Sequence, residues 1–154
     1  MWNAIANGVS TLYLNGGTGT NPPPNVPVSG QVALGIIPGT IPLARAVLMN
    51  PSGSGTGSTN IVLTLPPITT QFPVAPGQPA TNPGCGDEFQ ITLRNVQTSG
   101  AGTVTFQASP AVPGYPGDTV NPPDLNPIPN GTSSTSSGLT LMANAATRTW
   151  YRIA

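Results

Sequence analysis

The side chains that could carry out chemistry are few in this sequence. The chain contains no histidine and no lysine, so the usual general base at neutral pH and the amine of Schiff-base mechanisms are both missing. The single cysteine, Cys85, lies between two glycines, with no neighbouring cation in the sequence to lower its pKa. We expect it to be a small residue packed at a turn. The sequence therefore predicts a protein that is not an enzyme, with no catalytic residue and no cofactor.

The acidic residues do not form a paired acid–base site. Asp87 and Glu88 are adjacent at the start of a predicted strand, where neighbouring side chains point to opposite faces, so we expect edge or turn residues. Asp118 and Asp124 flank a proline-containing loop, where carboxylates and backbone carbonyls would suit calcium. Their spacing does not require a metal, and calcium binding by this pair stays open. A zinc site is excluded, because a single cysteine without histidine cannot complete the ligand set.

One group of side chains near the C-terminus is a candidate for binding a partner. Trp150 alternates with Arg148 and Arg152, and tryptophan and arginine are favoured anchors of interfaces. If exposed, the three side chains would bind a protein surface or stack on a sugar. The alternative is that Trp150 belongs to the core and that the arginines guard the edge of a sheet.

The charge content points towards association with other proteins. Charged residues make up 5% of the chain and its net charge is zero, whereas an ordinary soluble domain has roughly 25% charged residues. Few charges favour association over life as a free monomer. Scattered arginines cannot neutralise a run of phosphates, so we expect no nucleic-acid partner. No stretch approaches the ~20 apolar residues of a membrane span, and the N-terminus lacks the basic region of a secretory signal. We therefore expect neither membrane insertion nor export.

The elements that position these side chains are predicted to be strands. Apolar residues occur in short alternating blocks, separated by loops rich in the 20 prolines and 19 glycines of the chain. Residues 1–30 are predicted to form an extended N-terminal arm that lies on a neighbouring subunit through Trp2, Ile5 and Leu12, or else a flexible tail. Residues 31–154 are predicted to form one β-sandwich domain.

The strongest pattern lies between Gly84 and Ala108. Two alternating runs, Phe89–Arg94 and Thr103–Gln107, flank a segment of small turn-forming residues, which predicts an antiparallel hairpin with one apolar face. Further strands are predicted at Gln31–Ile37, Ala44–Met49, Asn60–Leu65, Leu139–Ala143 and Thr147–Ile153. The predicted fold is all-β: a single antiparallel β-sandwich of about 7–8 strands, jelly-roll or immunoglobulin-like, with long Pro/Gly-rich loops.

The order of short motifs from residue 60 to the end resembles that of β-rich structural proteins of tailed phages and other viruses. In those proteins a strand ending in TLP precedes a GD-x-F strand, a GTVT strand and a closing aromatic strand. The matching positions are Thr64-Leu65-Pro66, Gly86-Asp87-Glu88-Phe89, Asn95, Gly102-Thr103-Val104-Thr105 and Tyr151-Arg152-Ile153.

The resemblance implies a non-enzymatic virion protein. The expected role is that of a capsid decoration (cement) protein, or a minor capsid or fibre protein, that stabilises the shell through protein–protein contacts. By analogy it would be a homotrimer with the major capsid protein or another virion protein as its partner, located in the virion after assembly in the host cytoplasm. Two other classes stay open. One is a pilus-like extracellular filament subunit joined by strand exchange, and the other is a carbohydrate-binding fibre module that uses Trp150 or Tyr115.

Overall fold

The protein is all-β over the residues that the structure describes. The computed structural model describes residues 9–16, 25–28, 30–33, 44–51, 60–68, 72–73, 80–82, 85–97, 102–111, 114–131 and 137–154. The strands are β1 (Val9–Gly16), β2 (Asn25–Val28), β3 (Gly30–Ala33), β4 (Ala44–Asn50), β5 (Ile61–Thr64), β6 (Phe72–Pro73), β7 (Ala80–Asn82), β8 (Gln90–Asn95), β9 (Val104–Gln107), β10 (Thr119–Asn121), β11 (Ser137–Asn144) and β12 (Thr149–Arg152). These described parts contain no helix, and therefore no helix able to cross a membrane.

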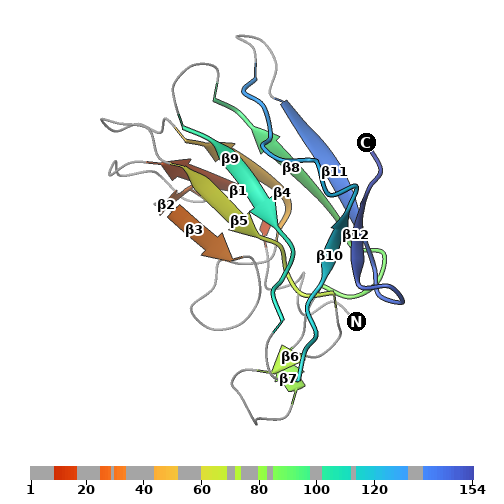
Figure 1. Ribbon diagram of the computed structural model, residues 1–154. Coiled ribbons are helices and arrows are strands. Elements are labelled where there is room, and N and C mark those ends of the chain that lie inside the picture. Colours follow the sequence, from red (N-terminus) through yellow and green to blue (C-terminus); the bar gives the residue numbers. More distant parts are fainter. Residues whose placement is uncertain are drawn as a thin grey trace.

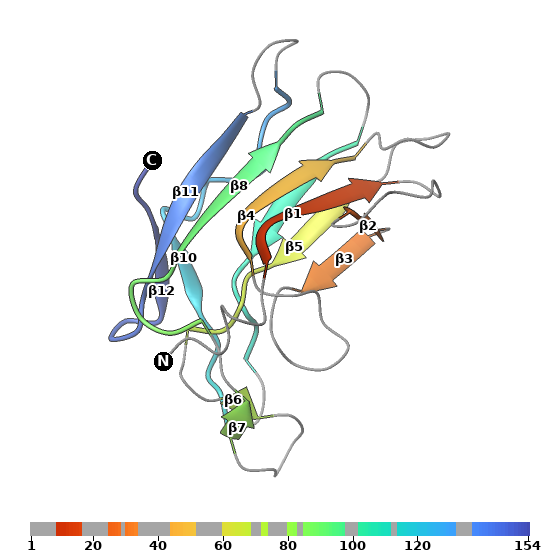
Figure 2. The ribbon, with the colours of Figure 1, turned by 180° about the vertical axis from the view of Figure 1, so that it is seen from behind.

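Two sheets face each other and form the body. The larger sheet has seven strands in the order β10-β12-β11-β8-β4-β1-β2, and the smaller has three strands in the order β3-β5-β9. Figure 1 shows the smaller sheet in front of β1, β4 and β8, and Figure 2 shows the same two layers from behind. The short β6–β7 pair projects away from the body at one end (Figure 1).

The chain alternates between the two sheets, so that neighbouring strands within a sheet run parallel. It passes from β4 in the larger sheet to β5 in the smaller one, and then from β8 to β9 in the same way. The pairs β4–β8 and β5–β9 are parallel in consequence. Parallel strands need a long crossover connection, and here a strand of the opposite sheet supplies it in place of a helix. Antiparallel pairing occurs where β8, β11 and β12 follow one another across the sheet.

The predicted hairpin of residues 84–108 is therefore wrong. Its two strands exist as β8 and β9, but β8 pairs with β4 and β11, whereas β9 pairs with β5 in the other sheet. Both strands show the same alternation because each has one face in the shared core, and alternation reports which face is buried and not which strand lies alongside. The all-β class is confirmed, but the antiparallel jelly-roll or immunoglobulin-like arrangement is not, because the pairing is mixed.

The core fills the space between the two sheets. In the larger sheet one row of buried side chains crosses four strands in register: Leu12, Val47, Leu93 and Leu139. The smaller sheet contributes the paired residues Ile61 with Val104 and Leu63 with Phe106, all buried in the same cluster. Trp150 is fully buried, with its ring edge-on to Phe89 at 6.5 Å between centroids.

The N-terminal region needs a correction. Val9–Gly16 lies inside the larger sheet between β4 and β2, and Leu12 belongs to the core with an exposed fraction of 2%. Asn25–Val28 is the edge strand of the same sheet. The prediction of a separate extended arm over residues 1–30 is therefore wrong for these two segments. Residues 1–8 and 17–24 lie outside the described residues.

Gly138 lets β11 pass close to β8. A Cβ atom at this position would meet the Leu93 carbonyl oxygen and would lie 2.8 Å from Arg94 Cγ. We expect Gly138→Ala to lower the free energy of unfolding by about 1–3 kcal/mol, because the backbone of β8 cannot move without disturbing its own pairing. Urea unfolding followed by tryptophan fluorescence measures this, with Ser137→Ala as the control on the same strand. An unchanged midpoint for Gly138→Ala would contradict the close approach of β11 to β8.

Candidate functional site

The residues predicted to bind a partner do not come together in the structure. Trp2 and Ile5 lie outside the described residues, whereas Leu12 and Trp150 are buried in the core. Because Trp150 has no exposed surface, it cannot present its ring to a sugar or to another protein. The structure therefore shows the alternative in which Trp150 belongs to the core.

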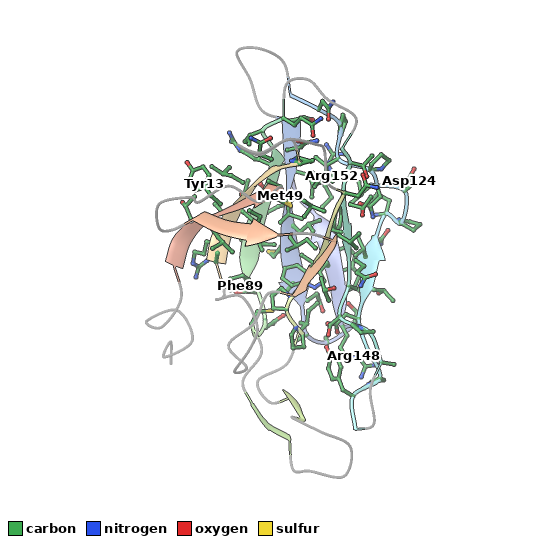
Figure 3. All side chains as sticks on the ribbon, turned by 90° about the vertical axis from the view of Figure 1, so that its left-hand side faces the viewer. Tyr13, Met49, Phe89, Asp124, Arg148 and Arg152 are labelled. Carbon is green, nitrogen blue, oxygen red and sulfur yellow. The ribbon has the colours of Figure 1, made fainter. Side chains whose placement is uncertain are left out.

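The two arginines beside Trp150 are exposed but lie apart. Arg148 ends the turn before β12 and has a φ of 48°, whereas Arg152 is the last residue of β12. Figure 3 shows the two side chains well separated along the molecule. Arg148 contributes its backbone carbonyl to β10, since Thr119 N donates to Arg148 O at 3.0 Å. The predicted trio is therefore not a continuous surface.

The adjacent acids Asp87 and Glu88 are turn residues, as expected. Asp87 accepts a hydrogen bond from Ala145 N at 2.7 Å and so fixes the turn between β11 and β12. Glu88 is exposed and has a positive φ of 57°, while its own N–H donates to Ala143 O. Both side chains are exposed at this turn.

The most unusual polar group in the described part of the chain is the half-buried carboxylate of Asp118. One of its oxygens accepts the hydrogen bond of the Tyr115 hydroxyl, and the other accepts from Ile68 N at 3.0 Å. Ile68 N also lies 3.1 Å from the Tyr115 hydroxyl oxygen. Asp118 thereby connects the segment before β10 to the segment after β5. Nothing in the sequence indicated this contact, because 50 residues separate Ile68 from Asp118.

Burial determines the proton affinity of this cluster. Removal from water raises the pKa of Asp118 above its ordinary value of 3.8, and the hydrogen bonds from Tyr115 and Ile68 and the charge of Arg148 oppose that rise. Burial, and then the hydrogen bond to Asp118, raise the pKa of the Tyr115 hydroxyl. The phenol therefore keeps its proton at neutral pH and donates a hydrogen bond to the Asp118 carboxylate.

Cys85 lies beside this cluster as an inert thiol. Its backbone N–H donates to Pro67 O at 3.0 Å, and its side chain is buried with an exposed fraction of 3%. Burial, and then the negative charge of Asp118, raise the pKa of the thiol. A thiolate nucleophile is disfavoured on both counts. This arrangement fits the prediction of a small packed residue at a turn.

The structure does not favour calcium at Asp118 and Asp124. Asp124 is exposed (Figure 3). Each carboxylate oxygen of Asp118 already accepts a hydrogen bond, one from Ile68 N and the other from the Tyr115 hydroxyl. A calcium site needs several oxygen ligands that converge on one point. Within the described ranges no group of three or more His, Cys, Asp or Glu side chains gathers as a metal site would require.

A seam between the two sheets is the best candidate for contact with another molecule. It lies between β9, the edge of the smaller sheet, and β10, the edge of the larger one. A groove of about 460 Å³ follows this seam, within the range of roughly 300–1,000 Å³ that is usual for ligand pockets. Its walls include Phe106, Ala108, Pro110, Pro116, Val120 and Pro123. Asp118 is the one ionisable residue among the residues that line it.

Part of the β9 edge is closed by the chain itself. Asn126 Oδ1 accepts from Phe106 N at 2.9 Å, and Asn126 Nδ2 donates to Phe106 O at 2.7 Å, so this side-chain amide takes the place of a neighbouring strand. Ile128 N donates to Val104 O at 2.9 Å beside it. The groove begins at Phe106, and along it Asp118 N donates to Ser109 O at 2.9 Å, so the segments that follow β9 and precede β10 are bonded to each other. Sequence reasoning missed Asn126, because an asparagine in a proline-rich loop carries no signal of such a contact.

Replacing Asp118 tests the buried carboxylate. Because the pKa of Asp118 is raised in the folded chain, its carboxylate binds a proton more tightly there than in the unfolded chain. The stabilisation that the proton brings is therefore complete below pH 3.8 and is lost as the pH rises through the raised pKa. We expect wild type to gain stability, relative to Asp118→Asn, as the pH falls from 7 towards 4. Urea unfolding at several pH values measures the difference, and parallel curves for the two proteins would contradict the assignment.

The thiol of Cys85 should be unreactive in the folded protein. We expect labelling by iodoacetamide at pH 8 to be at least about 100-fold slower than in the chain unfolded in urea, because each unit of raised pKa lowers the thiolate fraction tenfold. Mass spectrometry after timed quenching gives both rates. Comparable rates in the folded and unfolded chains would show that Cys85 is accessible and ionised.

In comparisons with protein-family models, with curated proteins and with solved structures, nothing matches this chain. The resemblance to virion proteins therefore stays a prediction, and the site rests on the geometry described above.

Proposed function

We propose that this chain is a structural subunit of a virion, acting as a capsid decoration (cement) protein. In this role it binds the shell through protein–protein contacts and stabilises it. The partners are other copies of the chain in a homotrimer and the major capsid protein, and the location is the virion. The motif order from residue 60 to the end supports the virion assignment. The structural support comes from the surface.

The observation that carries the proposal is how little charge the body presents and where that charge lies. The chain has eight charged residues in 154, and some of these serve the fold itself. Asp118 binds Tyr115 and Ile68, Asp87 binds the turn before β12, and Arg45 lies 5.0 Å over the Phe89 ring. A surface with few ions costs less to remove from water when another protein covers it, because few charged groups have to be desolvated.

The carbohydrate-binding module and the filament subunit differ in the support that they have. A carbohydrate-binding module loses support, because Trp150 and Tyr115, the rings that it relied on, are both buried. A filament subunit joined by strand exchange is not favoured by an observation of its own, and polymer formation is the outcome that would support it. The two facing sheets suit a β-sandwich, although their mixed strand directions differ from those of an antiparallel jelly roll.

Binding to capsids tests the proposal directly. We expect the chain to cosediment with capsids purified from the virus that encodes it. We also expect light scattering to give the molar mass of a trimer. Because few charges take part, the affinity should change less than about threefold between 0.05 and 0.5 M salt, since screening acts on exposed charges. Bovine serum albumin serves as the control for trapping in the pellet. A stable monomer that binds no capsid would contradict the proposal, and loss of binding at high salt would contradict the role given to the neutral surface.

A further inference from the structure

Asn130 and Gly131 form a chemically labile pair in the proline-rich segment between β10 and β11. Asparagine is thermally labile, because the backbone nitrogen of the next residue can attack its side-chain carbon. A following glycine hinders this attack least, because it has no Cβ. Asn130 is exposed, so water, the second reactant, can reach it. Whether the pair reacts therefore depends on how its atoms are held.

The side chain of Asn130 is held by the buried amide of Asn95. Asn95 is the last residue of β8 and has no exposed surface. Its Oδ1 accepts from Gln97 N at 3.0 Å, and its Nδ2 donates to Ile128 O and to Asn130 Oδ1, each at 3.1 Å. These contacts fix the orientation of Asn95, because a backbone N–H can only donate and a backbone C=O can only accept. The atom of Asn130 that contacts Asn95 is therefore its carbonyl oxygen.

The attacking nitrogen is also held. Gly131 N donates to Gln97 O at 2.9 Å. An amide nitrogen becomes a nucleophile only after it loses its proton, and in this bond the proton lies between the nitrogen and the acceptor carbonyl. Turning the nitrogen towards the side-chain carbon of Asn130 therefore requires that the bond break. Gln97 is buried, with an exposed fraction of 2%, so water does not replace the bond until the segment moves away.

The segment that carries the labile pair is attached to both sheets. Ile128 N donates to Val104 O of β9 at 2.9 Å, and Ile128 O accepts from Asn95 at the end of β8. β9 belongs to the smaller sheet and β8 to the larger one. The side chain of Ile128 is buried in the shared core. Local opening of residues 128–131 must therefore break contacts with two sheets, and such opening costs free energy.

We propose that Asn130 is a deamidation site that the folded chain keeps closed through Asn95 and Gln97. In the reaction the Gly131 nitrogen loses its proton and bonds to Asn130 Cγ, the Cγ–Nδ2 bond breaks, ammonia leaves and a succinimide remains. Water then opens the succinimide at one of its two carbonyls and gives aspartate or isoaspartate at position 130. No electrons are gained or lost. Because the fold withholds the nucleophile, the reaction proceeds from the locally opened segment.

Closure of this site preserves the charge and the contacts of the segment. Either product adds a negative charge to a chain whose net charge is zero. In isoaspartate the backbone passes through the former side-chain carbonyl and is one carbon longer, which displaces Gly131 from Gln97. The contacts of Asn95 and Gln97 therefore protect both the low charge of the surface and the attachment of residues 128–131 to β8.

Timed incubation at pH 8 tests whether the fold closes the site. Peptide mass spectrometry that separates aspartate and isoaspartate products gives the rate at Asn130 in the folded chain and in the chain unfolded in guanidinium chloride. We expect the folded chain to react at least about 100-fold more slowly, because a slow reaction of this kind follows the population of the opened segment. Equal rates in the two states would overturn the proposal.

Amide hydrogen exchange on the unmodified protein tests whether the bond of Gly131 to Gln97 is the cause. Exchange at the Gly131 amide needs the same opening as the attack by its nitrogen. The factor by which folding slows this exchange should therefore agree, to within about tenfold, with the factor by which folding slows deamidation. Slow deamidation beside a Gly131 amide that exchanges freely would contradict the proposal.

A pair of variants tests the part played by Asn95. Asn95→Ala removes the donor to Ile128 O and Asn130 Oδ1, and we expect deamidation at Asn130 to become at least about tenfold faster. Gln90→Ala changes an exposed side chain of the same strand and should react like wild type. The rate at Asn15-Gly16 in β1, measured in the same digest, should stay unchanged in both variants, which excludes loosening of the whole chain.

Equal rates at Asn130 in the two variants, or a rise at Asn15 as large as that at Asn130, would contradict the role given to Asn95. If Asn95→Ala does not fold, the comparison of exchange and deamidation in the unmodified protein decides. These measurements use the isolated chain, so their outcome is independent of the virion role.

Discussion

Burial of one face of β4, β5, β8, β9 and β11 between two sheets is the constraint on which this structure depends. Val47 and Leu93 from the larger sheet and Ile61 and Leu63 from the smaller one are all fully buried in the shared cluster. Burying a side chain of this size contributes about 1.5–3 kcal/mol relative to leaving it exposed. With a single cysteine, no disulfide within the chain can substitute for that burial. The polar contacts fix the positions of segments around a core that already holds the sheets together.

The way in which the chain winds explains where the structure is open. β2 and β3 follow one another with one residue between them, so the chain itself links the two sheets along that side. On the opposite side β9 is the edge of the smaller sheet and β10 is the edge of the larger one. There Asn126 and Ile128 close the edge of β9 as far as Phe106. Beyond Phe106 the segments that follow β9 and precede β10 are joined by the hydrogen bond from Asp118 N to Ser109 O at 2.9 Å, and the groove lies along this junction.

Much of the secondary structure could be predicted from the sequence, because alternation reports burial. The predicted strands at Ala44–Met49 and Asn60–Leu65 agree with β4 and β5 to within a residue at each end. Alternation does not report pairing, so the supposed hairpin separated into β8 and β9 in different sheets. The same limitation placed Val9–Gly16 in an arm, although it is a strand inside the larger sheet.

The candidate site could be predicted to a much smaller extent. Absence of histidine and lysine is a property of composition and needs no structure. The contact of Asp118 with Tyr115 and Ile68, and the closure of Phe106 by Asn126, depend on residues brought together from distant segments. No local pattern encodes such contacts. Trp150 shows the opposite problem, because its neighbours in the sequence suggested a surface, whereas its neighbours in space are core residues such as Phe89.

A cryo-electron-microscopy reconstruction of the assembled particle tests the central claim most directly, namely that this weakly charged β body exists to be covered by other protein. The account predicts copies of the chain on the shell, each with part of its body covered by neighbouring protein. A particle that lacks the chain, or one in which its body faces solvent on every side, would contradict the account.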